Sequence, residues 1–295
     1  MAQVLRYTVP SAFDGATVEQ FLRRGAGLSS HMIVRLRHAE RGIESEGVQL
    51  WTIHRVRAGQ VIQLNFPEDA VRIEGADLPL SVVYEDARLL VVDKPPYIAV
   101  HPSAGKTDPT VANAVVAHYA ACGAPASFRP TNRLDRNTSG LLLIAKDAHA
   151  AYSLTGQAKK AYLAVATGCL VGSGTVDAPI RRREGSIIAR EVGDGGKPSV
   201  THWEALGCDG QLTLLRVVID TGRTHQIRVH MAHLGHPLAG DTLYGNPDTA
   251  AHPIARQALH CAEINVPHPD TGEPLRFESP LPPDMAALVQ ERSLL

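Results

Sequence analysis

Long apolar runs are missing from the 295-residue chain: no stretch approaches the length needed to cross a bilayer, and the N-terminus has no apolar core of signal-peptide length. We therefore expect neither export nor membrane insertion. Cysteine is also scarce. The cysteines lie dozens of residues apart without a C-x-x-C pair, which predicts reduced thiols in a cytoplasmic protein. They are Cys122, Cys169, Cys208 and Cys261.

An excess of one charge sign is likewise absent from the chain as a whole, whose net charge is −1. The charges are unevenly distributed, because residues 1–67 hold eight arginines and five acidic residues, a balance of +3, which leaves −4 for residues 68–295. A basic segment on a mildly acidic body favours an anionic partner for that segment. A solvated surface with a few extra arginines would explain the charge equally well.

Sequence periodicity divides the chain into a small module, a linker and a larger domain. Residues 1–67 show helical spacing followed by strand-like segments, and residues 68–80 are acidic and punctuated by Pro and Gly, as is typical of a linker. Residues 81–295 alternate strands and helices without a βαβ rhythm, which predicts an α+β domain with a mixed or antiparallel central sheet and flanking helices. In the small module we expect helices at 17–24 and 31–40 and strands at 48–51 and 61–66.

The most informative stretch is Asn132 to Lys146, which reads NRLDRNTSGLLLIAK. Charged residues come first, turn formers follow, and the short apolar run at 141–145 predicts a buried strand. Asp135 is therefore expected on a tight loop held by the sheet, where functional side chains are commonly placed. Taken alone, R-L-D-R is more often structural, with the carboxylate pairing with an arginine and pinning the turn.

Four segments together resemble the RluA-type pseudouridine synthases, in order and in spacing. Chance matches become rare when four motifs stand in register. The resemblance covers roughly residues 80–283 and implies the mixed-sheet catalytic fold of that family. The segments are VVDKPPYIAVHPS (91–103), RPTNRLDRNTSGLLLIAK (129–146), KKAYLAVATG (159–168) and TGRTHQIRVHMAHLGHPLAGDTLYG (221–245).

The resemblance also implies roles for individual residues. It makes Asp135 the catalytic carboxylate and Arg228 the arginine that pairs with it. Tyr162 is implied to stack against the target base, and Arg133 to displace that base from the RNA stack. Further contacts with the RNA substrate are expected from Arg136, His225 and Ile227.

The chemistry of the reaction explains these residue types. Converting uridine to pseudouridine breaks the glycosidic bond and re-forms it from carbon five of the same base, so nothing is oxidised or consumed and no metal or cofactor is required. An ionised carboxylate can attack the sugar or the base, and a nearby arginine keeps such a group charged. The target base must leave the stack, so the site needs a flat face to receive it. Tyr162 offers that face; the alternative is an ordinary half-buried strand aromatic.

Two positions depart from the family pattern. Asn132 replaces the His most common before R-L-D, although it can still bond a neighbouring backbone group. Tyr97 stands where the K-P-x-G pattern has Gly, so we expect the loop after Lys94 to differ in shape.

Residues 1–67 resemble the αL RNA-binding module found in ribosomal protein S-four and in many RNA-modifying enzymes. The matching text is TVEQFLRR, LSSHMIVRLR, GI…EGVQL and HRVRAGQVIQL, with departures at His31 and Gln60. The resemblance implies RNA contacts from Arg24 and Arg35.

Four histidines within twelve residues, at 225, 230, 233 and 236, form a pattern that can mark zinc. His225 and His230 flank a strand-like run and are expected to face opposite sides, and no cysteine stands nearby. We therefore expect hydrogen-bonding or RNA-contacting histidines and no metal.

The sequence thus predicts an RNA pseudouridine synthase that acts on structured RNA, rRNA or tRNA, as a cytoplasmic monomer without a cofactor. One alternative is an inactive relative that binds RNA as a ribosome-assembly factor. Asp135, Tyr162 and Arg228 argue against it, because a binder has no need of a nucleophile. A second alternative, a glycoside hydrolase, would need paired carboxylates, and the Asp135 region offers one.

Overall fold

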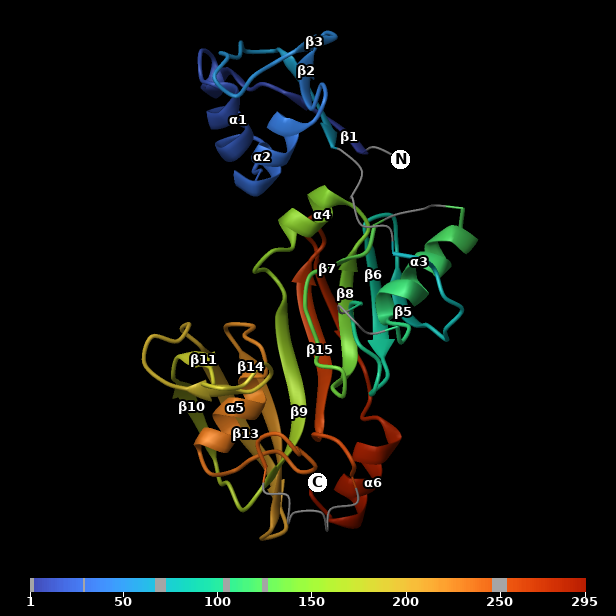
Figure 1. Ribbon diagram of the computed structural model, residues 1–295, viewed down its shortest axis with the longest axis vertical. Coiled ribbons are helices and arrows are strands. Elements are labelled where there is room, and N and C mark those ends of the chain that lie inside the picture. Colours follow the sequence, from blue (N-terminus) through green and yellow to red (C-terminus); the bar gives the residue numbers. More distant parts are fainter. Residues whose placement is uncertain (1–2, 29, 67–72, 103–106, 124–126, 246–253) are drawn as a thin grey trace. The chain divides into compact units, whose positions relative to one another are not determined.

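The computed structural model describes residues 3–28, 30–66, 73–102, 107–123, 127–245 and 254–295 (Figure 1). The chain divides into two compact units, here called the small unit (residues 1–73 with 125–127) and the large unit (residues 74–124 with 128–295). Among the described residues, every helix is too short or too polar to cross a membrane.

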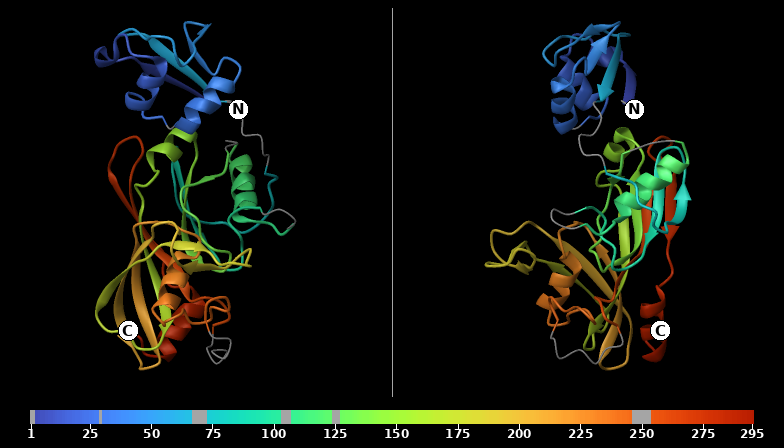
Figure 2. Two further views of the ribbon diagram at one scale, coloured as in Figure 1. Left: turned by 60° about the vertical axis from the view of Figure 1, so that its left-hand side comes forward. Right: turned by 45° about the vertical axis from the view of Figure 1, so that its right-hand side comes forward.

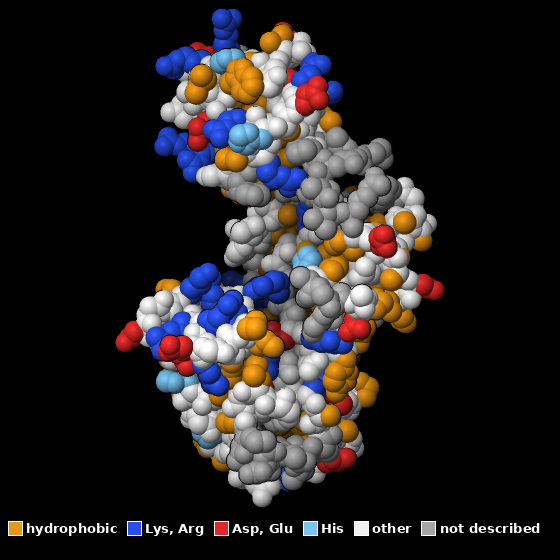
Figure 3. Space-filling view, viewed as in Figure 1, with side chains coloured by type: hydrophobic (Ala, Val, Ile, Leu, Met, Phe, Trp, Pro, Cys, Tyr) orange, Lys and Arg blue, Asp and Glu red, His pale blue; other side chains and the backbone are white. Residues whose placement is uncertain are grey.

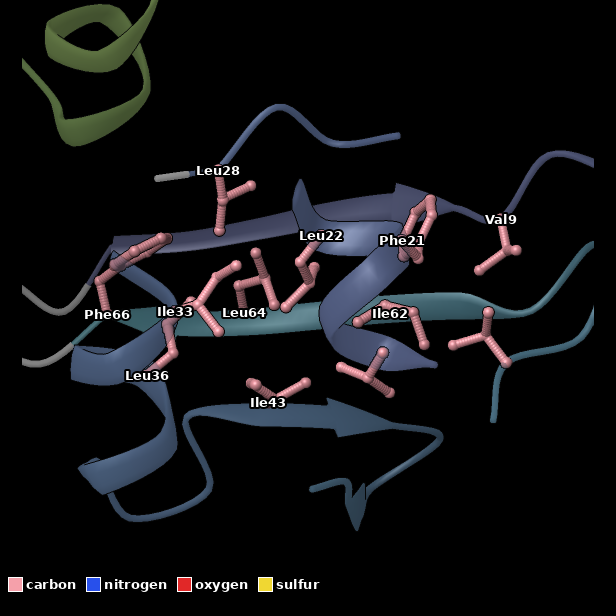
Figure 4. Packing of buried hydrophobic residues seen from close by; sticks show 12 residues of the cluster. Val9, Phe21, Leu22, Leu28, Ile33, Leu36, Ile43, Ile62, Leu64 and Phe66 are labelled. Carbon is pink, nitrogen blue, oxygen red and sulfur yellow. The ribbon is translucent and has the colours of Figure 1, made fainter. Parts of the chain in front are cut away.

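The small unit packs two helices on an antiparallel sheet of order β1-β4-β2-β3. Alternate residues of β4, namely Ile62, Leu64 and Phe66, are buried, and they pack against Phe21 and Leu22 of α1 (Figure 4). A capping box between Thr17 and Gln20 begins α1. The elements are β1 (Gln3–Thr8), a 3-10 turn (Ser11–Phe13), α1 (Val18–Arg24), α2 (Ser30–His38), β2 (Ile43–Ser45), β3 (Val48–Gln49) and β4 (Val61–Phe66).

Both expected helices and both expected strands of this unit are present, although β3 is shorter than expected. The sequence did not predict β1 or β2. A three-residue strand such as β2 carries almost no periodic signal. Its extended conformation is stabilised by pairing with β4, which a local sequence pattern does not reveal.

The large unit is built on a ten-stranded mixed sheet of order β10-β13-β14-β9-β15-β8-β6-β5, with β16 paired to β15 and β7 to β8. Within the described residues β8 and β15 are parallel, and the other neighbouring strands are antiparallel. The α+β prediction is confirmed. Figures 1 and 2 show α3 beside β5 and β6, and α6 near the start of β15. The strands are β5 (Ser81–Glu85), β6 (Leu89–Lys94), β7 (Arg129–Pro130), β8 (Ser139–Ala145), β9 (Lys159–Thr167), β10 (Ser173–Asp177), β11 (Ile180–Arg182), β12 (Arg190–Val192), β13 (Val200–Cys208), β14 (Leu212–Ile219), β15 (Leu259–Pro267) and β16 (Pro274–Glu278), and the helices are α3 (Val111–Ala121), α4 (Ala148–Ser153), α5 (Gln226–His233) and α6 (Pro283–Glu291).

Strand β8 is the buried strand that the apolar run predicted, since all of its residues are buried. Gly140 lies where β8 meets β15. Its φ is +108°, and a Cβ there would lie 2.3 Å from the carbonyl oxygen of Cys261. Only glycine allows this close approach of the two strands, and it fixes the start of β8 directly behind the loop that carries Asp135.

Residues 226–233 correct a sequence prediction, because they form helix α5 and not a strand-like run. Its residues from Gln226 to Met231 are all buried. Polar and apolar residues alternate from Gln226 to Met231, which is the period of a strand, and β-branched Ile227 and Val229 resemble strand residues.

The prediction of reduced thiols was wrong for two of the four cysteines. Cys169 and Cys208 form a disulfide, with 6.0 Å between their Cα atoms, whereas Cys122 and Cys261 are free. Cys169 follows β9 and Cys208 ends β13, and both strands pair with β14. The sheet topology therefore brings together residues that stand 39 apart in the sequence.

The predicted linker, residues 68–80, lies only partly within the described chain, which resumes at residue 73. The carbonyl of Glu74 accepts a hydrogen bond of 2.8 Å from Asn113 Nδ2, and the Ala76 amide donates to the Asn113 carbonyl at 3.1 Å. This end of the segment is thus bound to α3.

Candidate active site

A cavity of about 500 Å³ opens in the large unit, between the Asp135 loop, β9 and the start of α5. Arg24 and Arg35 belong to the small unit and do not line it. The residues singled out in the large unit come from three separate motifs, and all of them line the cavity: Arg133, Asp135, Arg136, Tyr162, His225, Ile227 and Arg228.

Arg228 lies between two carboxylates. Its Nη1 donates to Asp135 Oδ2 at 2.9 Å, while Nε and Nη2 donate to the two oxygens of Asp241 at 2.7 and 2.8 Å. Burial lowers the pKa of the guanidinium, but the two carboxylates outweigh this and raise the pKa above its ordinary value. The two-point ion pair with buried Asp241 fixes the guanidinium plane, and so it aims the third donor at Asp135.

A chain of hydrogen bonds orients His225 beside the same carboxylate. The Arg190 amide donates to the Tyr244 hydroxyl at 2.9 Å, and that hydroxyl lies 2.7 Å from His225 Nδ1. Burial lowers the pKa of His225, so the ring is neutral at neutral pH. The Tyr244 oxygen already accepts a hydrogen bond from the Arg190 amide, so we assign the Tyr244 hydroxyl as the donor to His225 Nδ1. The neutral ring then carries its own proton on Nε2. Nε2 lies 3.8 Å from Asp135 Oδ2.

Asn132 holds the Asp135 loop against β8. Its Nδ2 donates to the Leu141 carbonyl at 3.1 Å, and its Oδ1 accepts from the Leu143 amide at 2.8 Å. The residue that departs from the family pattern therefore bonds the neighbouring backbone at both ends of its side-chain amide.

Lys94 fixes the loop from the other side. Its buried ammonium donates to the carbonyls of Pro95, Ile98 and Arg136 at 2.8, 2.9 and 3.0 Å. Burial, together with the charge of Arg256, lowers the pKa of Lys94 to about 7. The three carbonyls tie the loop after Lys94 to the residue that follows Asp135.

Arg256 supports the turn between Asp135 and β8. It is buried, donates to the Asn137 carbonyl at 3.0 Å, and forms a two-point ion pair of 2.6 and 2.8 Å with Asp284 of α6. Sequence reasoning assigned no role to Lys94, Asp241, Tyr244 or Arg256. Lys94, Asp241 and Tyr244 lie within the motif segments quoted above, so the motifs could have drawn attention to them. The available signal for Arg256 was a charged residue next to an apolar strand.

Tyr162 lies deep in the cavity. It is 5% exposed, and it stands opposite Cys261 where β9 pairs with β15. Burial, with the neighbouring Cys261 and Asp135, raises the pKa of its hydroxyl well above the ordinary value, so the group stays protonated at neutral pH. The ring can form a flat apolar wall for a base.

The two arginines that flank Asp135 differ in their surroundings. Arg133 is exposed, with Nη2 3.5 Å from Thr224 Oγ1. Arg136 is held by the Tyr97 carbonyl at 2.9 Å and by Asp108 at 3.0 Å.

Basic side chains also gather on the face of the large unit near β11 and β14 (Figure 3).

The clustered histidines have separate partners. His230 is buried between Thr201 Oγ1 and the Ala178 carbonyl, at 2.9 and 3.0 Å, and His236 Nδ1 lies 2.8 Å from the Thr167 carbonyl. In the part of the chain that the structure describes, no three His, Cys, Asp or Glu side chains are grouped so that they could hold a metal ion.

Comparison with known proteins identifies the family of the chain. Residues 88–233 match the family model for RNA pseudouridylate synthase. The chain is 38% identical to an uncharacterized RNA pseudouridine synthase, YjbO, of Bacillus subtilis (strain 168), over 90% of this chain and 95% of that one. It is 39% identical to ribosomal large subunit pseudouridine synthase D of Vibrio cholerae, over 79% and 78% of the two chains. Among solved structures, human RNA pseudouridylate synthase domain containing 1 superposes with a TM-score of 0.57 at 27% identity, covering 76% of this chain and 98% of that one. The chain therefore belongs to the RluA-type family of RNA pseudouridine synthases.

Proposed function

We propose that this RNA uridine-to-pseudouridine isomerase modifies large-subunit ribosomal RNA and uses Asp135 as its nucleophile. The isomerase activity follows from family membership. The rRNA substrate is supported by relatives such as that of Vibrio cholerae, which are named for the large ribosomal subunit. We further propose that the enzyme acts on structured RNA as a monomer without a cofactor. The cytoplasmic location stays a prediction.

The observation that carries the role of Asp135 is its position in the cavity against Arg228. Arg228 and His225 both approach Oδ2, and within the described residues Oδ1 has no hydrogen-bond partner. An ionised carboxylate with one oxygen held and the other open can attack the ribose or the base. A protein that only bound RNA would have no use for this arrangement, which favours an enzyme over an assembly factor.

The remaining steps of the reaction require a pocket that can hold the extruded base. The uridine leaves the stack and enters the cavity, where Tyr162 forms a wall beside it. After the glycosidic bond breaks, the base turns so that its carbon five faces the sugar. The new carbon–carbon bond forms there and Asp135 is released as a free carboxylate. Carbon five loses its proton to solvent, and N1 of the base takes up a proton in exchange. Arg133 is exposed on the same loop, which supports a role for it in occupying the gap left in the RNA stack.

The small unit contributes affinity for RNA in this proposal. Arg24 is exposed in the last turn of α1, and Arg35 lies half-buried in the last turn of α2. Basic side chains are prominent on the face of this unit in Figure 3. Arginines so placed can neutralise phosphates and position the RNA without reading its sequence.

The proposal is tested by incubating the purified protein with unmodified large-subunit rRNA transcribed in vitro and mapping pseudouridine along it. We expect modification at one or a few uridines. Modification of tRNA transcripts with none in the rRNA would overturn the proposal that large-subunit rRNA is the substrate. No pseudouridine in either RNA would overturn the function.

A further inference from the structure

Tyr97 is a bulky residue in a backbone conformation that favours glycine. Its φ is +69°. Residues other than Gly, Asn and Asp rarely adopt this left-handed region, since Cβ crowds the following carbonyl oxygen. The loop after Lys94 thus contains a glycine-like turn, to which this sequence adds an aromatic ring at the position where the family pattern has Gly. Strain of this kind persists only where the surroundings enforce it, and it concentrates at functional sites.

The surroundings of Tyr97 do enforce the turn. Lys94 Nζ donates to the carbonyls of Pro95 and Ile98, on either side of Tyr97. The Tyr97 carbonyl itself accepts from Arg136 Nε at 2.9 Å. The turn is therefore bonded to the residue that follows Asp135, and the backbone from which the ring projects is held close to the proposed nucleophile.

The ring lies at the rim of the catalytic cavity. Tyr97 lines that cavity, and it is 49% exposed where Tyr162, deeper in the same cavity, is 5% exposed. A single exposed aromatic residue needs no special explanation by itself. An exposed ring held by a strained and clamped turn, at the entrance through which a base must pass, does need one.

We propose that Tyr97 stacks against the nucleotide next to the target uridine and so fixes how the RNA strand enters the cavity. The inference rests on the proposed function. When the uridine is extruded, its neighbours lose a stacking partner and expose a flat face. An aromatic side chain at the rim replaces that partner, and it does so for any base, because every base has a π-face.

The test compares Tyr97→Phe, Tyr97→Leu and Tyr97→Gly in the full-length protein. Turnover is followed by tritium release from a large-subunit rRNA transcript that carries the label at carbon five of uridine. We expect Tyr97→Phe to match the wild type. Tyr97→Leu and Tyr97→Gly lose the stacking contact and raise KM about tenfold, with a much smaller effect on kcat. Tyr97→Gly also relieves the backbone strain, so its Tm should equal or exceed that of the wild type.

Three outcomes overturn the inference: an unchanged KM in both the Leu and Gly variants, a fall in kcat at constant KM, or a Phe variant as impaired as the Leu variant. The last would assign the effect to the hydroxyl. Binding of a fluorescein-labelled oligouridylate provides a second readout without turnover, in which the Gly variant binds more weakly than the Phe variant. Equal binding by the two would also overturn the inference. A wild-type protein that releases no tritium would instead contradict the proposed function.

Discussion

At the scale of single residues, Arg228 determines the geometry of the site. Its three donating nitrogens bind two carboxylates, and the pair with Asp241 leaves Nη1 aimed at Asp135. A lysine at this position could neutralise one carboxylate, but its single ammonium cannot reproduce the planar fork. Arg228 therefore orients the Asp135 carboxylate in addition to balancing its charge.

We therefore expect Arg228→Lys to lower kcat on the order of a hundredfold, because small misplacements of a nucleophile have effects of that size. KM should change little, since the variant keeps the cavity and the charge. Arg223→Lys is the matched control. Arg223 also lines the cavity, but its guanidinium donates to the Pro198 carbonyl and not to Asp135. Steady-state kinetics that show equal losses in both variants would contradict this account of Arg228.

The sequence predicted the residues of the cavity better than the residues that hold them. Asp135, Tyr162 and Arg228 stand in recognisable motifs, and the structure brings all three to one cavity. The supporting contacts join distant segments: Arg256 and Asn137, for example, are 119 residues apart. Such pairings depend on the three-dimensional fold, which no local pattern of residue types contains.

At the scale of elements, prediction succeeded where burial was one-sided or the segment was short and apolar. Strand β8 and helices α1 and α2 follow directly from their residue patterns. Helix α5 did not, because its polar and apolar residues alternate with the period of a strand. Strand β2 was missed because it is a strand only through its pairing with β4.

Helices α1 and α2 carry a prediction about RNA affinity. Replacing Arg24 and Arg35 by Gln should weaken RNA binding and flatten the plot of log affinity against log salt by up to about two units, since each lost phosphate contact removes about 0.7 to 0.9. Arg6→Gln is the control, because Arg6 lies on β1 of the same unit and bonds Gln63. A salt series on the full-length proteins measures the slopes. A slope in the double variant equal to that of the wild type would rule out the proposed RNA contacts.

At the scale of the whole molecule, buried neutral histidines link the stability of the large unit to pH. Burial lowers the pKa of His225, His230 and His260 below the ordinary value of 6.5. Below pH 6.5 the unfolded chain therefore binds protons that the folded chain does not. The free energy of unfolding should fall as pH falls through 6.5, by up to about 1.4 kcal/mol per pH unit for each such histidine.

Urea unfolding at pH 7.5 and pH 5.5 checks this. The two tryptophans divide between the units, so a Trp51→Phe background leaves Trp203 of β13 to report on the large unit. We expect a lower urea midpoint at pH 5.5, and a smaller pH effect in His230→Gln, which removes a fully buried titrating group. A midpoint that stays constant or rises with acid would show that these histidines are not held neutral.

The central claim is that Asp135 is the nucleophile, and the most direct measurement is the rate of pseudouridine formation by Asp135→Asn. The variant keeps the shape of the side chain and removes its charge. Asp108→Asn is the matched control, because Asp108 also lines the cavity but pairs with Arg136 at its exposed rim. With saturating large-subunit rRNA transcript, we predict that Asp135→Asn loses activity by on the order of a thousandfold or more, while it binds the RNA as tightly as the wild type and Asp108→Asn keeps most of its rate. A wild-type rate in Asp135→Asn would contradict the claim.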